Sequence, residues 1–213
     1  MDPRWTRVDA TNRPDKLDVR ARCYYYTEYT PHAGWGYSDA NQRVFNYKIN
    51  PSALDLNPAR VKYKNQAIEE YADAIVGLLQ SFRLRANGEP LLSLGGGIVL
   101  LPVPPSVPLG EEGYDDRNVR TCGIVSQRLG ISVCRDVETA RSIGSSHAGG
   151  TRDPRVIEGS LSRVGYGCNS ASVVFIVDDT LVSGAHYTAI CNLLEHTGCP
   201  AFTSGIFLAR SMS

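Results

Sequence analysis

Apolar residues in the second half of the chain recur at two spacings, which predict helices and strands in alternation. From about residue 64 to 85 they lie three and four positions apart, as on one face of a helix. That stripe consists of Ile68, Tyr71, Ala72, Ile75, Val76 and Leu79. The runs at 97–103 and 173–177 are apolar throughout, which is typical of strands buried on both faces.

The rest of this region continues the alternation. Helices are expected at about 115–129, where Asp115 and Asp116 complement the N-terminal dipole, and at 184–196. Strands are expected at 131–138 and 201–208. This order predicts an α/β fold with a mostly parallel central sheet flanked by helices, and ligands in such folds bind beyond the carboxyl ends of the strands.

The first part of the chain has a different composition. Residues 1–20 are polar, whereas residues 22–49 are rich in tyrosine and tryptophan. Strand-like segments at 23–29 and 43–49 flank glycine and polar residues, a pattern that predicts a β-hairpin or small sheet. We therefore expect an N-terminal extension with a small aromatic-rich β hood over residues 1–62, and an α/β domain over residues 63–213.

Charge and hydropathy narrow the function classes. The 213 residues carry 22 basic and 22 acidic side chains, so the formal net charge is zero and nucleic-acid binding is not expected. No apolar run approaches the roughly 20 residues that span a bilayer, and the N-terminus lacks the apolar core of a signal peptide. We expect a soluble, cytoplasmic protein without a membrane partner.

Six cysteines are spread along the chain. They form no Cys-x-x-Cys pair, and no histidine lies at zinc-finger spacing from them. Reduced and mostly buried thiols are therefore a better interpretation than a zinc site.

Two adjacent acids, Asp178 and Asp179, follow the buried strand at 173–177, and a Ser-Gly turn leads from them into the helix at 184–196. The carboxylates can accept hydrogen bonds from the vicinal hydroxyls of a sugar. The amides of the turn and the dipole of the helix can hold a phosphate. The alternative is that the acids only cap a turn, but two acids at a buried strand end repel each other, which favours a binding role.

A resemblance to the type I phosphoribosyltransferase family lies in the segment Ile176-Val177-Asp178-Asp179-Thr180-Leu181-Val182-Ser183-Gly184-Ala185-His186, which is similar to the family's signature for phosphoribosyl pyrophosphate (PRPP). The competence-protein F branch is similar at three more places: the Pro-Val-Pro that opens the loop after residues 97–103, Tyr114-Asp115-Asp116-Arg117, and Leu208-Ala209-Arg210. The resemblance covers roughly residues 60–210. It implies the type I phosphoribosyltransferase fold, with Asp178 and Asp179 on the ribose 2′- and 3′-hydroxyls.

The resemblance assigns the 5′-phosphate to a loop formed by Val182, Ser183, Gly184, Ala185 and His186. Ser183 supplies a hydroxyl, and Gly184 permits a tight backbone turn. Val182 and His186 depart from the family signature, which has threonines there. A histidine that donates to phosphate and a surface histidine at a helix start are equal alternatives for His186. Val182 also replaces the aspartate that contacts purine N7 in the 6-oxopurine members, so their mechanism is not expected.

The loop of Pro104, Pro105 and Ser106 occupies the position of the family's pyrophosphate loop. It contains no lysine or arginine, which makes Arg117 at the start of the next helix the candidate cation. A solvated surface arginine is the alternative for Arg117. Prolines that simply end the strand are the alternative for the loop.

Arg141, His147 and Arg152 are candidate catalytic residues, because their segment is rich in glycine and serine and stands where the family has a flexible catalytic loop. Arg155 lies in the same segment. Basic residues on such a loop exclude water and neutralise the leaving pyrophosphate. An ordinary polar loop explains the same composition.

These residues imply a protein that binds PRPP with Mg²⁺ and transfers the phosphoribosyl group to or from a nitrogenous base, with pyrophosphate exchange. Mg²⁺ would be held by PRPP oxygens and waters, with no direct protein ligand. The competing hypothesis is a non-catalytic PRPP- or nucleotide-binding regulatory protein on the same fold. The family implies a homodimer.

The aromatic rings of the N-terminal hood have two alternatives. They either stack on the base or, as sequence spacing favours, pack within the sheet.

Overall fold

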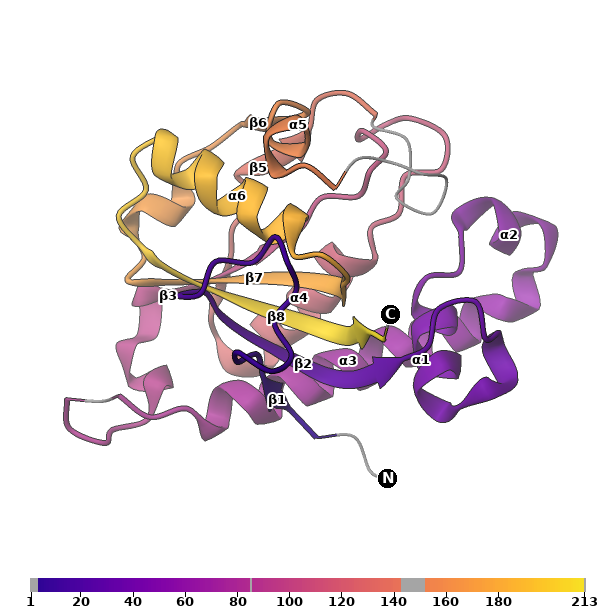
Figure 1. Ribbon diagram of the computed structural model, residues 1–213, viewed down its shortest axis with the longest axis horizontal. Coiled ribbons are helices and arrows are strands. Elements are labelled where there is room, and N and C mark those ends of the chain that lie inside the picture. The colour runs from indigo at the N-terminus through magenta and orange to yellow at the C-terminus, as the bar shows by residue number, and fades with distance from the viewer. Residues whose placement is uncertain (1–3, 85, 143–151, 213) are drawn as a thin grey trace.

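The computed structural model describes residues 4–84, 86–142 and 152–212, which form a six-stranded central sheet with helices on both faces (Figure 1). The strands lie in the order β1-β2-β8-β7-β3-β4. β1 pairs antiparallel to β2, and all other neighbours in this sheet are parallel. Their bounds are β1 Thr6–Arg7, β2 Arg22–Tyr29, β3 Ile98–Pro102, β4 Ser132–Val133, β7 Val173–Leu181 and β8 Phe202–Ser211.

The helices and a small second sheet surround this central sheet. The α-helices are α1 Asp39–Tyr47, α2 Pro51–Leu56, α3 Val61–Ser81, α4 Arg117–Leu129, α5 Pro154–Glu158 and α6 Ala185–His196. Short 3₁₀ helices are η1 Trp35–Tyr37, η2 Pro58–Arg60, η3 Leu91–Gly97 and η5 Gly167–Ser170. β5 (Val137–Thr139) and β6 (Leu161–Arg163) form an antiparallel pair beside α5. Within the described ranges, no helix is long and apolar enough to cross a membrane.

Side chains of β7 alternate between two separate cores. Phe175 and Val177 belong to the core beneath α1, α3 and α4, whereas Val174 and Ile176 belong to the core beneath α6. Successive residues of a strand point to opposite faces of the sheet. The two cores therefore explain why the run is apolar at every position, and they set the directions in which the acids that follow it point.

The predicted α/β class is confirmed, with a mostly parallel central sheet flanked by helices. The four predicted helices and strands around residues 64–85, 97–103, 115–129 and 184–196 are present as α3, β3, α4 and α6. β7 and β8 are also present, but each extends beyond the predicted end, to Leu181 and Ser211. The longer β7 places both acids inside the strand rather than after it.

The predicted β-hairpin is wrong, because residues 43–49 lie mostly in α1. Asn41, Val44 and Tyr47 are buried at intervals of three, which is the spacing of a helix face, and Ser38 caps the helix by accepting a hydrogen bond from the amide of Asn41 at 3.1 Å. The strand predicted at 23–29 exists as β2, but it pairs with β8 in the central sheet instead of forming a hood. A boundary between two parts at residue 62 stays a prediction.

The strand predicted at 131–138 is also wrong as a single element. Its first part is β4 and its last part belongs to β5, in the other sheet. Between them, Asp136 accepts a hydrogen bond from the amide of Cys168 at 2.8 Å, which draws the chain away from the central sheet.

Candidate functional site

Asp178 and Asp179 lie near the carboxyl end of β7, with β3 and β8 on either side. Parallel neighbours bring the loop after β3, which contains Ser106, to the same edge of the sheet. The side chain of Asp179 points to the same face of the sheet as those of Phe175 and Val177, the face that α1, α3 and α4 cover. The two adjacent acids therefore meet different groups.

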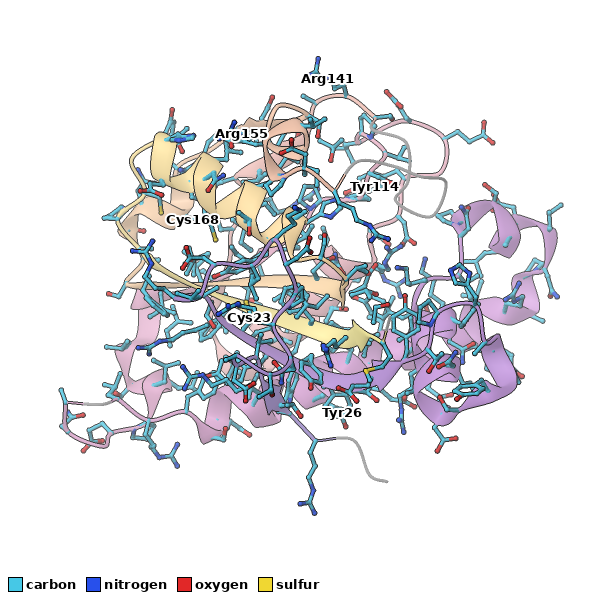
Figure 2. All side chains as sticks on the ribbon, in the orientation of Figure 1. Cys23, Tyr26, Tyr114, Arg141, Arg155 and Cys168 are labelled. Carbon is cyan, nitrogen blue, oxygen red and sulfur yellow. The ribbon has the colours of Figure 1, made fainter. Side chains whose placement is uncertain are left out.

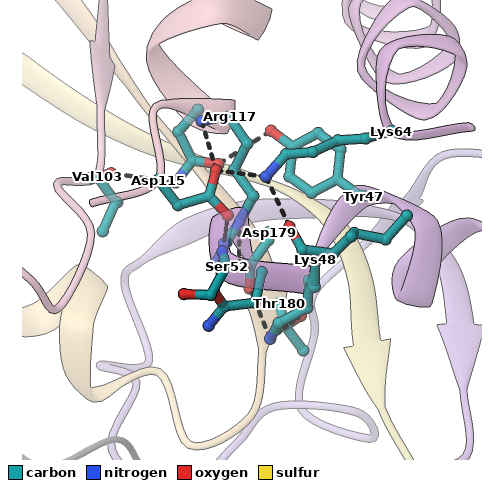
Figure 3. A network of polar contacts seen from close by, with 12 residues as sticks. Tyr47, Lys48, Ser52, Lys64, Val103, Asp115, Arg117, Asp179 and Thr180 are labelled. Carbon is teal, nitrogen blue, oxygen red and sulfur yellow. Dashed lines mark hydrogen bonds and ion pairs between the residues drawn. The ribbon is translucent and has the colours of Figure 1, made fainter. Parts of the chain in front are cut away.

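Asp179 is buried and paired with two cations (Figure 3). Its Oδ2 accepts hydrogen bonds from Nε of Arg117 at 3.0 Å and from Nη2 of the same guanidinium. Its Oδ1 accepts a hydrogen bond from Nζ of Lys48 at 3.2 Å. Burial alone would raise the pKa of Asp179, but the charges of Lys48 and Arg117 outweigh it and hold that pKa far below its usual value.

The ion pair of Asp179 is one end of a longer buried network. Nη1 of Arg117 lies 2.6 Å from Oδ2 of Asp115, whose Oδ1 lies 2.7 Å from Nζ of Lys64. The Lys64 side chain is only 3% exposed, and burial lowers its pKa although Asp115 opposes that shift. Charges of alternating sign thus run from Lys48 through Asp179, Arg117 and Asp115 to Lys64 (Figure 3).

Asp178 is in a contrasting environment. Its Oδ1 accepts hydrogen bonds from the amide of Asp179 at 2.8 Å and from Nδ2 of Asn118 at 3.4 Å, but no ion pair reaches it among the described residues. Loss of water around the carboxyl raises its pKa, and the charge of Asp179 raises it further, with His186 opposing the shift. One acid is therefore held firmly as a carboxylate and its neighbour takes up a proton more readily.

The predicted phosphate loop joins β7 to α6. Val182 is exposed, Gly184 has a φ of 82°, and α6 begins at Ala185, whose amide donates to Oγ of Ser183 at 3.3 Å. The left-handed backbone at Gly184 favours glycine. Amides at the start of this 12-residue helix are positioned to receive an anion.

An N-terminal segment packs against this loop. The amide of Lys16 donates to the carbonyl oxygen of Ser183 at 3.0 Å, and the hydroxyl of Thr188 donates to the carbonyl oxygen of Lys16 at 2.7 Å. Leu17 fills the space beside Gly184 so closely that a Cβ there would lie 3.0 Å from the Leu17 Cβ. The loop is therefore fixed from outside by residues that precede β2.

The loop after β3 and the loop after β7 face one pocket. Its lining includes Pro104, Pro105 and Ser106 from the first loop and His186 from the start of α6. The predicted pyrophosphate loop and the last residue of the predicted phosphate loop thus line the same pocket. Arg117 does not line it, because that guanidinium is bound to Asp115 and Asp179 and is not a solvated surface group.

The predicted catalytic segment is only partly described, and His147 lies outside the described residues. Arg141 is exposed at the outer edge of the molecule (Figure 2), where its Nη2 donates to the carbonyl oxygen of Gly159 at 2.8 Å. Arg152 is exposed just before α5. In the part of the chain that the structure describes, no hydrogen bond or ion pair joins either arginine to Asp178 or Asp179. Their catalytic role stays a prediction.

Several site residues were not predicted from the sequence. Lys48 follows α1, a segment whose spacing was interpreted as a strand, and the helical spacing of Asn41, Val44 and Tyr47 was the available signal. Asn118 follows Arg117 directly. The hydroxyl of Tyr47 donates to Oδ1 of Asn118 at 3.0 Å, which orients that amide.

Comparisons with known proteins add a distant structural likeness. No protein-family model matches the chain, and no curated protein matches it. Among solved structures, the chain is similar to the adenine phosphoribosyl transferase from Trypanosoma brucei in complex with AMP, pyrophosphate and ribose-5-phosphate, with 9% sequence identity and a TM-score of 0.45. The match covers 97% of this chain and 87% of that chain. A likeness this distant carries no functional argument.

Proposed function

We propose that this chain binds PRPP at the carboxyl end of β7 and transfers its phosphoribosyl group to, or from, a nitrogenous base. The observation that supports the proposal best is the convergence of three parts at one sheet edge. Asp178 and Asp179 lie near the carboxyl end of β7, the loop at 182–186 leads into α6, and Ser106 and His186 line one pocket. Adjacent acids, an anion-binding helix start and a second loop match the parts of a phosphorylated ribose with its pyrophosphate.

Each part has a distinct task in this proposal. Oxygens of Asp178 and Asp179 accept hydrogen bonds from the ribose 2′- and 3′-hydroxyls. Amides from Ser183 to His186 hold the 5′-phosphate, and the hydroxyl of Ser106 with nearby amides holds pyrophosphate.

In the transfer, the bond between ribose C1 and the pyrophosphate oxygen breaks, and pyrophosphate leaves with the electron pair. The base nitrogen forms the new bond to C1, and its proton passes to an oxygen of the leaving pyrophosphate or to water. The ribose C1 becomes positively charged in the transition state, and the carboxylates near the ribose stabilise that charge. Exclusion of water from the site prevents hydrolysis at C1.

In this proposal Mg²⁺ binds together with PRPP. Bound to PRPP, the ion would neutralise the pyrophosphate oxygens. Asp179 is a poor direct ligand because Lys48 and Arg117 already neutralise it, whereas Asp178 has no cation of its own among the described residues. This donor set would fit an ion held mainly by phosphate oxygens and water.

A second candidate function is a regulatory protein that binds PRPP or a nucleotide without turnover. It is favoured by the ion pairs on Asp179, which a ribose hydroxyl must compete with, and by the absence of lysine and arginine from residues 104–106. Val182 and His186, which depart from the family signature, favour it as well. Both functions place PRPP on the same residues, so binding and turnover must be measured separately.

The test combines calorimetric titration of the full chain with PRPP and Mg²⁺ and an assay of pyrophosphate release over a panel of purine and pyrimidine bases. Binding and base-dependent release support the transferase, and binding without release supports the regulatory protein. Asp178→Asn should abolish PRPP binding, whereas Asp73→Asn, a surface acid paired with Arg128, should bind as the wild type does. Absence of PRPP and nucleotide binding in the folded wild-type chain would reject both functions.

A further inference from the structure

Two cysteine thiols lie against each other away from the candidate site. Cys134 follows β4 and Cys168 lies in η5, and their sulfur atoms are 2.6 Å apart. Both residues are buried. Non-bonded carbon atoms pack at about 3.5–4.0 Å and sulfur is larger than carbon, whereas a disulfide joins sulfurs at about 2.05 Å. The two thiols are thus held closer than packing alone requires.

The carboxyl group of Asp136 lies beside both thiols. Its Oδ2 accepts the amide hydrogen of Cys168 at 2.8 Å, and Nη2 of Arg163 lies 3.6 Å away. Burial would raise the pKa of Asp136, but hydrogen bonds from Cys134, Cys168 and Gly167 outweigh it and lower that pKa. The carboxylate in turn is one of the groups that raise the pKa of Cys168, after the sulfur of Cys134 and burial, so the reduced Cys168 is held as a thiol.

A metal ion is the first alternative for such a cluster. Ligand atoms of Cys134, Asp136 and Cys168 all lie within 4.8 Å of one another. Zinc at about 2.3 Å from each sulfur would need the two sulfurs roughly 3.8 Å apart, and a structural zinc site takes four protein ligands. Asp136 is already neutralised by Arg163, and the cluster offers three ligands among the described residues. The geometry is closer to that of a covalent bond.

We propose that Cys134 and Cys168 are a cross-linking pair that forms an intramolecular disulfide when the protein meets a small-molecule disulfide such as oxidised glutathione. One cysteine gives up its proton as it attacks a sulfur of the small disulfide, and the first half of that disulfide takes up a proton and leaves as a thiol, so a mixed disulfide remains on the protein. The second cysteine thiolate then attacks the protein sulfur of the mixed disulfide and releases the other half. The cysteines lose two protons and two electrons, and the small disulfide becomes two thiols.

The bond would close a specific part of the chain. The two cysteines are 34 positions apart, and β5, α5, β6 and Arg141 lie between them. Cys134 is anchored to the central sheet because its amide donates to the carbonyl oxygen of Leu100 at 2.8 Å, and η5 leads directly into β7. A cross-link therefore fastens both ends of this excursion to the sheet that carries Asp178 and Asp179, whether or not the chain binds PRPP.

The test treats the full chain with oxidised glutathione or with a reductant and counts thiols after denaturation. Of the six thiols, two should disappear on oxidation, the intact mass should fall by two hydrogens, and peptide mapping should join Cys134 to Cys168. The melting temperature should rise by roughly 10 °C, because the closed loop limits the unfolded chain. Cys122→Ser, which removes a buried thiol in α4, should still form the bond, and Cys134→Ser should not.

Three results would overturn the proposal. One is that oxidised wild-type protein keeps all six thiols. Another is a disulfide between other cysteines. The third is stoichiometric zinc in protein purified without oxidant, with the two thiols protected until the zinc is removed. Peptide mapping needs only wild-type protein, so the proposal stays testable if a cysteine variant fails to fold.

Discussion

Arg117 and Asp179, 62 positions apart, are joined by two hydrogen bonds from one guanidinium to one carboxylate oxygen. The pair fastens the start of α4 to the carboxyl end of β7. Arginine suits this task because its rigid fork of donors loses little freedom when it binds. The same guanidinium also holds Asp115, so one side chain positions two acids at the edge of the sheet.

Replacing this arginine should cost much more stability than replacing an exposed one. Arg117→Gln leaves Asp179 buried with only Lys48, and we expect the free energy of unfolding to fall by about 2–3 kcal/mol. Arg128→Gln is the matched control, because Arg128 also pairs with two acids, Glu69 and Asp73, but at the surface. Its loss should stay within about 1 kcal/mol. Urea denaturation measures both, and equal losses would contradict the role given to Arg117.

Asp178 and Asp179 should respond differently to neutralisation. Asp178→Asn keeps a side-chain oxygen that accepts the hydrogen bond from the amide of Asp179. It also removes a negative charge that burial and Asp179 disfavour, so stability at pH 7 should be unchanged or slightly higher. Asp179→Asn leaves Lys48 and Arg117 without their shared carboxylate, and stability should fall by about 2 kcal/mol. Thermal denaturation distinguishes the two. A reversed order would refute the assignment of their environments.

The contribution of Asp179 should depend on pH in a defined direction. Its pKa is lowered in the folded chain, so its stabilising effect is complete above the unfolded value near 3.8 and is lost as pH falls below it toward the folded value. We therefore expect the stability difference between wild type and Asp179→Asn to be constant from pH 7 to about 5 and to shrink below about 4. Urea titrations of both proteins at each pH measure that difference. A difference that grows as pH falls would show the opposite sign.

Two glycines with a similar positive φ should differ in their tolerance of a side chain. Gly184→Ala and Gly198→Ala both place alanine at positive φ, which costs roughly 1–2 kcal/mol. A Cβ at Gly198 meets nothing within 4 Å, whereas one at Gly184 meets Leu17 at 3.0 Å. The Gly184 variant should therefore lose at least about 1 kcal/mol more, and it should bind PRPP more weakly if the loop holds phosphate. Equal stability losses would argue against a fixed loop.

Sequence spacing was sufficient to predict an element where one physical cause dominates its burial. The apolar run at 173–177 is buried in two cores, so it was identifiable as a strand, and the acids after it follow from adjacency alone. Lys48 could not be assigned in this way. It meets Asp179 only because α1 packs beside β2 and α3, and that packing joins residues 131 positions apart.

The aromatic segment shows how composition can mislead. Tyrosine, phenylalanine and tryptophan favour strands in general, and residues 43–49 contain several apolar and aromatic residues. The burial of Asn41, Val44 and Tyr47 on one side, with Phe45 left 41% exposed, decides for a helix. Tertiary packing therefore overrides the strand preference of the individual residues.

The position of β8 between β2 and β7 has a consequence for the time at which the protein can fold. β2 is made early in synthesis, yet its parallel partner is β8, and β8 also borders the strand that carries Asp178 and Asp179. A nascent chain that has not yet reached residues 202–211 lacks the strand that joins its first part to β7. The meeting of Lys48 with Asp179 is therefore an event of the last stage of synthesis, and a ribosome-bound chain stalled before β8 should not yet have the candidate site.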